Sequence, residues 1–197
     1  GFNSQLFRYA NQEIKNFTDN GKTVKLALYG RKAKGAFKSS QFETIDVFEN
    51  IEPDQFGGYA EKLTENLTVM LNENAFEKAV LVFNRFESVM TQTPVTAQAL
   101  PMKLESDNED RLDGDYLYEP DGAEILSELL PMALRTQILQ AFLEKEAGEQ
   151  AARMQAMENA TKNAGEMIDQ LTQVYNRARQ AAITKELIEI ISGAEAL

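Results

Sequence analysis

The sequence predicts an α/β fold with a mostly parallel sheet, followed by a very long C-terminal helix. Two observations predict this class. In the first half of the chain, amphipathic helical patterns alternate with short apolar strands, which is typical of parallel strands joined by crossover helices. From Met132 to Ser192 there is no proline, and at about 1.5 Å per residue this span would form a helix of roughly 90 Å.

The first elements of the α/β part follow in order. Residues 4–17 place apolar side chains near one helical face, with Ser4 as the expected N-cap. Residues 23–30, TVKLALYG, predict a strand. Residues 53–75 predict a second helix, because Pro53 suits a first helical turn and the pattern that follows is amphipathic.

Two further strands complete the α/β part. Residues 78–86, KAVLVFNRF, form a continuously apolar run of the kind that is buried on both faces of a sheet. Residues 93–102 predict another strand, which Pro94 and Pro101 place at a sheet edge because proline cannot donate to the strand ladder.

An acidic stretch separates this part from the rest. Residues 1–104 carry 12 Lys/Arg and 12 Asp/Glu, whereas residues 105–197 carry 8 and 19, so the net charge of −11 arises in the second part. We interpret residues 105–115 as an acidic linker. The excess of negative charge argues against a nucleic-acid partner for the second part.

We therefore predict an α/β domain over 1–120 and a helical part over 121–197. A short helix is expected up to Leu130, ended or bent by Pro131, and a long helix over about 132–192. Its apolar positions recur with an average spacing of about 3.5 residues, as in a coiled-coil seam. They are Leu134, Ile138, Phe142, Ala147, Ala151, Met154, Met157, Ala160, Ala164, Ile168, Leu171, Tyr175, Ala178 and Ala182.

This seam needs a partner helix. Between residues 147 and 165 the helix is rich in alanine and glycine, which would let a neighbouring helix approach closely. The sequence holds no second helical pattern of comparable length. The partner is therefore expected from another segment or another chain.

Composition excludes several classes of catalytic site. The sequence has no cysteine and no histidine, so disulfides and Ser–His or Cys–His catalysis are impossible. The glycines in GFNS and in FGG at 56–58 do not complete a phosphate-binding loop. No apolar run reaches the roughly 20 residues of a membrane-spanning helix.

Two charged clusters have an ordinary interpretation beside a functional one. A basic patch after the first strand could bind an anion, but a solvated helix face is favoured: Arg31, Lys32, Lys34 and Lys38. Carboxylates in the linker, and at Glu144 and Glu146, lack the spacing of a calcium loop. We predict no catalytic residue, no metal site and no cofactor.

The C-terminal end of the long helix carries more apolar surface than a chain end normally does. Leaving its aliphatic side chains in water would forgo roughly 1.5–3 kcal/mol each. Helical spacing puts them on more than one face, so we expect a partner to enclose this tip: Ile183, Leu187, Ile188, Ile190 and Ile191. Four polar residues of the long helix could be ordinary solubilising surface residues: Arg153, Arg177, Arg179 and Gln180. Near an apolar tip, however, the planar fork of donors of an arginine would suit carboxylates on the partner.

Residues 149–194, EQAARMQAMENATKNAGEMIDQLTQVYNRARQAAITKELIEIISGA, closely resemble the C-terminal helix of the γ subunit of F-type ATP synthase, in its bacterial form. GFNS at the start, FNRFESVMTQTP at 83–94 and YLYEPDG at 116–122 resemble further γ segments in the same order. The resemblance thus covers essentially the whole chain. The family's N-terminal helix and first strand, which precede GFN, have no counterpart in this sequence.

The resemblance implies a rotor shaft. In the family, a Rossmann-like α/β domain stands at the foot of an antiparallel coiled coil, so the missing N-terminal helix of its own chain would be the partner of the long helix. The tip turns in an apolar bearing within the hexamer of α and β subunits, while the foot contacts the c-subunit ring and the ε subunit. Proton flow turns the shaft, which drives ATP synthesis on β and regulates ATPase activity, and γ itself catalyses nothing.

The resemblance also implies residue roles. Contact with β and energy coupling are expected of Arg153, Arg179, Gln180, Thr184 and Glu186. The five aliphatic tip residues would line the bearing, and Tyr116 and Glu119 would contact the c ring. The expected location is peripheral, at the cytoplasmic face of a bacterial inner membrane, with the matrix side of the mitochondrial inner membrane as the alternative.

Two other classes of function stay open from the residues alone. A coiled-coil adaptor with an α/β head and no rotary role would also need an exposed seam. A nucleotide-dependent enzyme would need a phosphate-binding loop and a general base, and the sequence offers neither in recognisable form.

Overall fold

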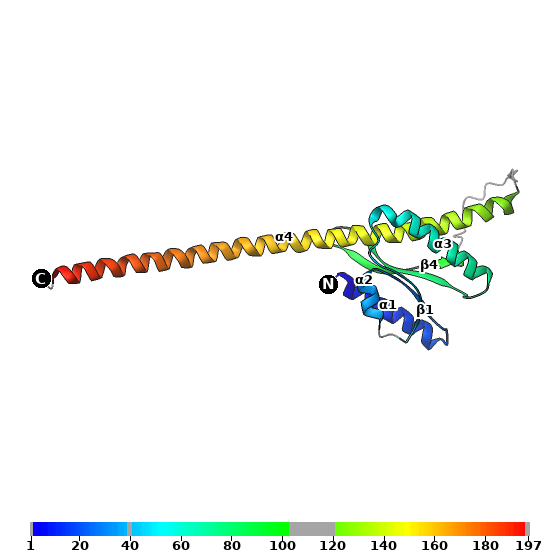
Figure 1. Cartoon of the computed structure of the whole chain (residues 1–197), viewed down its shortest axis with the longest axis horizontal. Helices are drawn as coiled ribbons and strands as arrows, with labels where there is room; N and C mark the ends of the chain where they lie inside the picture. Colours follow the sequence, from blue (N-terminus) through cyan, green and yellow to red (C-terminus); the bar gives the residue numbers. More distant parts are fainter. Residues whose placement is uncertain (1, 39–40, 103–120, 196–197) are drawn as a thin grey trace, which may run out of the picture. The chain divides into compact units, whose positions relative to one another are not determined.

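The computed structural model describes residues 2–38, 41–102 and 121–195, in which helices and strands alternate (Figure 1). The α/β class and the long C-terminal helix are confirmed. The chain divides into two compact units, Gly1–Ala152 and Arg153–Leu197. The elements are α1 (Phe2–Asp19), β1 (Lys25–Tyr29), α2 (Arg31–Phe37), β2 (Glu43–Phe48), a 3-10 turn (Pro53–Gln55), α3 (Phe56–Asn72), β3 (Ala79–Phe86), β4 (Gln92–Leu100) and α4 (Gly122–Glu195).

The described strands form two pairs. β1 and β2 run parallel, with Leu28 beside Val47, and β3 and β4 run antiparallel, with Phe83 beside Val95. The parallel arrangement expected from the sequence thus applies to the first pair. The second pair is antiparallel because residues 87–91 connect it as a short turn, and a parallel pair needs a crossover of a dozen or more residues.

Two local features differ from the sequence prediction. α1 begins at Phe2, so Ser4 lies inside the helix and is not its N-cap. β2 has no counterpart in the prediction, because its sequence ETIDVF neither alternates regularly nor forms a continuous apolar run. Strand pairing with β1, which no local pattern reports, makes this segment a strand.

A small core joins α1, β1 and α2. Its buried members are Ile14, Leu28 and Phe37. The rings of Phe7 and Phe37 meet edge to face, with centroids 6.0 Å apart. This cluster fixes α1 and α2 beside the parallel strand pair.

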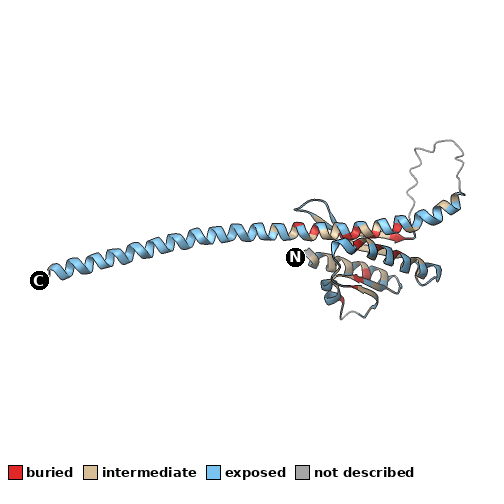
Figure 2. Ribbon diagram, turned by 45° about the horizontal axis from the view of Figure 1, so that its top comes forward, coloured by how far each residue is buried: buried red, intermediate tan, exposed pale blue. Residues whose placement is uncertain are grey.

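The larger core of the first unit joins α3, β4 and the first half of α4. Its buried members are Phe56, Ala60, Ala99, Leu100, Leu134, Ile138 and Phe142. The three that α4 contributes recur every four residues, so they lie on one face of that helix. Figure 2 shows this buried face in red where α4 passes the strands.

α4 begins as part of the α/β unit. The sequence predicts a division near residue 120 and a break at Pro131, whereas α4 continues through Pro131 and the first compact unit extends to Ala152. A proline inside a helix costs about 3 kcal/mol. Burying a leucine contributes about 1.5–3 kcal/mol, so the burial of Leu134 in the next turn offsets that loss. The predicted linker, 105–115, lies outside the described residues.

The second unit is the remainder of α4. Every residue from Ala156 to Ala194 is exposed in this chain, as the pale blue helix of Figure 2 shows. Its large apolar side chains are included, for example Met157 at 63 % and Leu171 at 61 % exposure. This part of the helix gains no burial from the chain described.

Ile138→Ala should lower the free energy of unfolding of the first unit by about 2–5 kcal/mol, because it leaves a cavity in a well-packed core. Ile138 is 1 % exposed. Leu187→Ala is the control, with an expected change below about 0.5 kcal/mol, since Leu187 is exposed. Urea unfolding followed by tyrosine fluorescence measures both, because Tyr29 and Tyr59 pack against this core. Equal losses in the two variants would contradict the assignment.

Candidate functional site

The aliphatic residues of the predicted tip lie on the last turns of α4. Each is between 52 % and 70 % exposed: Ile183, Leu187, Ile188, Ile190 and Ile191. With 3.6 residues per turn, they follow one another around an arc of about 160°. The other side carries Lys185 and Glu189, whose charged groups are 3.7 Å apart. The tip therefore has one broad apolar face, called here the tip face, and one polar face.

The predicted coiled-coil seam is only partly open to a partner, because its positions Leu134, Ile138, Phe142 and Ala151 are buried in the first unit. Its positions between residues 154 and 182, called here the seam, form a second exposed apolar surface of α4. Its large members are all exposed: Met154, Met157, Ile168, Leu171 and Tyr175. At 3.6 residues per turn, the seam lies on roughly the opposite side of the helix from the tip face. The apolar surface changes sides between Ala182 and Ile183. One flat partner surface cannot cover both.

The polar residues predicted near the tip separate into two pairs. Thr184 Oγ1 donates a hydrogen bond of 2.9 Å to the backbone carbonyl oxygen of Gln180, one turn earlier, and both residues are in line with the tip face. Arg179 and Glu186 share the flank next to the tip face, about 10 Å apart along the axis, which is too far for an ion pair. All four are exposed.

The other predicted contact residues lie elsewhere. Arg153 is exposed at the start of the second unit, about 40 Å along the helix from Arg179. Tyr116 and Glu119 lie outside the described residues. In the basic patch, Lys34 pairs with Glu49 at 2.5 Å, which supports the solvated helix face.

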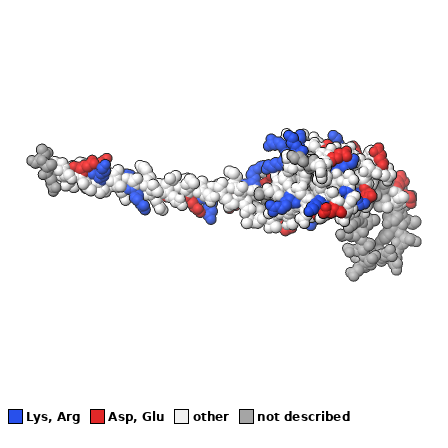
Figure 3. Space-filling model, turned by 90° about the horizontal axis from the view of Figure 1, so that it is seen from below, with Lys and Arg blue, Asp and Glu red and all other residues white. Residues whose placement is uncertain are grey.

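Charged side chains are widely spaced along one side of the exposed helix (Figure 3). On the side drawn in Figure 3, white uncharged side chains dominate the second unit, with acidic and basic groups at separate places. Contiguous exposed apolar surface on a protein marks a site of interaction. The seam and the tip face are therefore the main candidate contact surfaces.

Within residues 2–38, 41–102 and 121–195, no group of three or more acidic side chains is placed to hold a metal ion. None of the helices in these ranges is both long enough and apolar enough to cross a membrane.

A groove of about 980 Å³ lies in the first unit between the β3–β4 pair and α4. Val80 and Gln98 line it from the strands, and Met132 and Gln137 from the helix. Gln137 Oε1 is buried and has no hydrogen-bond partner among the described atoms. No local sequence pattern indicates this groove, because its two walls are far apart along the chain.

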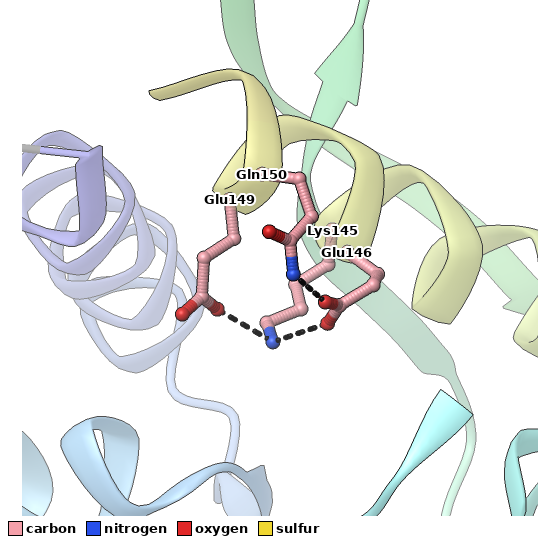
Figure 4. Close-up of polar contacts among 4 residues, drawn as sticks. All are labelled: Lys145, Glu146, Glu149 and Gln150. Atoms are coloured by element: carbon pink, nitrogen blue, oxygen red, sulfur yellow. Dashed lines mark hydrogen bonds and ion pairs between the residues drawn. The ribbon is translucent and has the colours of Figure 1, made fainter. Parts of the chain in front are cut away.

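A charged cluster surrounds Lys145 on α4 (Figure 4). Lys145 Nζ lies 2.7 Å from Glu149 Oε2 and 3.2 Å from Glu146 Oε2. Gln150 Nε2 donates a hydrogen bond of 2.7 Å to Glu146 Oε1. The side chains of Lys145, Glu146 and Glu149 are only 23–30 % exposed. Lys145 and Glu149, four residues apart, are the one sequence signal that could have indicated this cluster.

The same ammonium faces an aromatic stack. Lys145 Nζ is 5.4 Å from the centroid of the Tyr29 ring, at the end of β1. Tyr29 stacks on Phe142 with centroids 4.6 Å apart and an interplanar angle of 27°. Two side chains of α4 therefore contact one ring of the strand.

The pKa values of Tyr29 and Lys145 are both raised. Burial raises the pKa of Tyr29, and the Lys145 ammonium only partly opposes this. Burial lowers the pKa of Lys145, but hydrogen bonds and charge from Glu149, together with Tyr29 and Glu146, outweigh burial and raise it. Glu144, the other carboxylate considered for a metal, accepts hydrogen bonds from Phe86 N and Gln140 Nε2.

Known proteins match this chain along its whole length. The model of the ATP synthase family matches residues 1–197. An ATP synthase gamma chain of Pelagibacter ubique is 42 % identical over 201 residues, and one of a Methylobacterium species is 45 % identical over 199. Each match covers 100 % of this chain and 68 % of the relative.

Two solved structures share the fold. A chain of the Euglena gracilis mitochondrial ATP synthase, in a structure of OSCP, F1 and c-ring, has a TM-score of 0.55 and 19 % identity, covering 94 % of this chain and 67 % of its own length. A chain of the Tetrahymena thermophila mitochondrial ATP synthase, in a structure of the central stalk and c-ring, has a TM-score of 0.53 and 17 % identity. The match covers 76 % of the present chain and 66 % of the Tetrahymena chain. At these identities the likeness concerns the fold alone.

The stability of the first unit should fall as the pH rises above about 10, and less so in Lys145→Met. The folded-state pKa values of Tyr29 and Lys145 lie above their ordinary values of 10.0 and 10.5. Their stabilisation is therefore complete below the unfolded-state pKa values and is lost as pH rises through the folded-state values. Urea midpoints at pH 8 and pH 11 measure this loss. The same loss in wild type and variant would show that Lys145 does not contribute to it.

Proposed function

Because the chain belongs to the γ-chain family of ATP synthase, we propose that it is the central rotor shaft of that complex. It couples rotation of the c ring, driven by protons, to ATP synthesis at the catalytic sites of the β subunits, and it regulates ATPase activity. The observation that carries the proposal is α4, whose exposed length bears two apolar surfaces on opposite sides.

The tip face suits an enclosing apolar sleeve, and we assign it to the hexamer of α and β subunits. An arc of about 160° gives such a sleeve a broad apolar surface to cover. The opposite polar side, with Lys185 and Glu189, makes the tip asymmetric. An asymmetric tip that turns would present different surfaces to successive β subunits, and this difference is what a rotary coupling mechanism needs.

The polar residues near the tip are assigned to contacts with β. Arg179 offers a planar fork of donors that suits a carboxylate in a bidentate geometry. Gln180 and Thr184 are in line with the tip face and would enter the interface between that face and the hexamer. Glu186 and Arg179 would contact β from the flank next to the tip face. Arg153 would contact β or couple energy farther along the shaft.

The seam is assigned to a helix of the γ chain itself, the N-terminal helix, in an antiparallel coiled coil. The heptad spacing of the seam supports a helical partner. Ala133, Thr136 and Gln140, in and beside the groove of the first unit, occupy the same heptad positions as Met154 and Met157. The chain spans about two thirds of the length of the γ chains it matches.

The α/β domain, 1–120, is assigned to the foot of the rotor. Tyr116 and Glu119 would contact the c ring, and the ε subunit would bind the same part of the rotor.

We place the protein at the cytoplasmic face of a bacterial inner membrane, with a mitochondrial matrix location as the alternative. Catalysis is assigned to β, and γ contributes mechanically. The alternative of an adaptor without a rotary role finds no support in the comparisons.

Co-purification with α and β subunits tests the proposal. Full-length γ containing this chain should form a hexamer complex that hydrolyses ATP, and a bead attached to the α/β domain should turn as ATP is consumed. If ATP is hydrolysed while the bead stays still, the rotor assignment is wrong.

Arg179→Ala combined with Gln180→Ala should weaken assembly or coupling roughly tenfold or more, because hydrogen bonds to charged groups contribute about 1.5–3 kcal/mol each. ATP-driven proton pumping per ATP hydrolysed is the measurement. The α/β unit should stay folded, since both residues are exposed. Lys62→Ala, which removes an exposed charge from α3, is the control. Unfolding of the α/β unit in the double variant would count against a role in contacts with β.

A further inference from the structure

The attachment of α4 to the α/β unit determines how stiffly a rotor of this design can transmit torque. This step rests on the proposed rotor function. If the α/β domain is turned from below while the tip of α4 is loaded, the torque must cross the contacts between α4 and that domain. Within the described residues, these contacts include the core around Phe142, the cluster around Lys145, the hydrogen bond from Phe86 N to Glu144, and the ion pair of 3.7 Å between Arg135 and Glu61.

The core contacts bury one face of α4 against the α/β unit. Leu134, Ile138 and Phe142 are buried on one face of α4. Apolar burial scales with the area removed from water, and the close packing of these side chains resists rotation of the helix. A contact that depends on the relative orientation of two groups adds to this resistance.

Tyr29 makes such a contact. Its ring stacks on Phe142 on one side and faces the Lys145 ammonium on another, and these two α4 residues are three positions apart. Phe56 meets the same ring edge to face, with centroids 6.2 Å apart. The last residue of β1 is thus held by two neighbouring side chains of the long helix. Turning or sliding α4 would move both away from the ring.

Lys145 is itself fixed before it meets the ring. A free lysine side chain has several rotatable bonds and would transmit little force. Here Glu146 and Glu149, both on α4, hold its ammonium at 3.2 Å and 2.7 Å, and Gln150 holds Glu146 in turn (Figure 4). The charge is therefore presented to the Tyr29 ring in an orientation that the helix determines.

An apolar side chain could also fill this position, because Lys145 is only 26 % exposed. Burial lowers the pKa of its ammonium, although hydrogen bonds and charge from Glu149, together with Tyr29 and Glu146, outweigh burial and raise that pKa. Methionine, an unbranched apolar side chain of similar length, would fill the position without desolvating a charge, and such replacements of half-buried or buried ion pairs are often neutral in stability. What methionine cannot supply is an oriented cation over an aromatic face.

We propose that Lys145 is a positioning residue that fixes the rotational setting of α4 on the α/β unit by holding Tyr29 against Phe142, and that it makes this junction torsionally stiff. The contact lies outside the tip face and the seam, and its partners belong to this chain.

The test uses full-length γ assembled with α and β subunits, the hexamer immobilised and a probe attached to the α/β unit. Angular variance of the probe during pauses between steps reports the stiffness between tip and probe. In Lys145→Met the variance should be roughly twofold larger, because one side chain of α4 then holds the ring in place of two. Lys145→Arg keeps a cation over the ring and should restore the wild-type variance. Lys62→Met is the matched control on an exposed surface.

Thermal unfolding of γ and the ATP hydrolysis rate are measured in parallel, and both should stay at the wild-type level in Lys145→Met. If the wild-type complex rotates but Lys145→Met shows the wild-type angular variance, the positioning role of Lys145 is wrong and the rotor function still holds. A wild-type complex that does not rotate would overturn both. Lys145→Gln is the second variant, and loss of folding in both Lys145→Met and Lys145→Gln would show a folding role and overturn the positioning role.

Discussion

The burial of one face of α4 in the α/β unit is the contact on which the rest of the structure depends. Leu134, Ile138 and Phe142 place the helix across α3 and β4, and they carry it past a proline that would otherwise favour a break. A helix in water is supported only by propensity and local pairs, which are weak. The packed turns therefore fix the first part of α4 within the first unit.

The exposed part of α4 carries the large apolar side chains expected of a surface that binds other chains or segments. Its apolar side chains occupy two sides of the helix in succession, first the seam and then the tip face, with the change near Ala182. A single helix can therefore engage one partner along most of its length and a different one at its end. In the proposed shaft this arrangement would separate two mechanical tasks, because the seam would bind a second helix and the tip face would contact the subunits that the shaft drives.

The cluster around Lys145 differs from both surfaces because its partners belong to the same chain. It combines ion pairs within α4 and a ring contact to β1, so it relates the helix to the sheet by orientation as well as by burial. Half-buried charge is expensive unless it is paired, and here every acid and the ring contribute to the pairing. In a protein that transmits torque, an oriented contact such as that between Lys145 and Tyr29 would resist rotation of α4 against β1.

Local periodicity in the sequence was enough to predict α1, β1, α3, β3, β4 and the exposed helix with its seam, because amphipathic spacing depends on neighbours a few residues away. The aliphatic tip was likewise evident from spacing, and the resemblance carried by residues 149–194 supplied the roles of Arg179 and Gln180. Those residue roles stay predictions, and Tyr116 and Glu119 lie outside the described residues.

Only the tertiary structure decided which distant elements meet. The antiparallel pairing of β3 with β4, the existence of β2, the passage of α4 through Pro131 and the contact between Tyr29 and Lys145 all depend on such meetings. The physical reason is the same in each case. A sequence pattern reports which face of an element is apolar, whereas packing between segments far apart in the chain determines what that face touches.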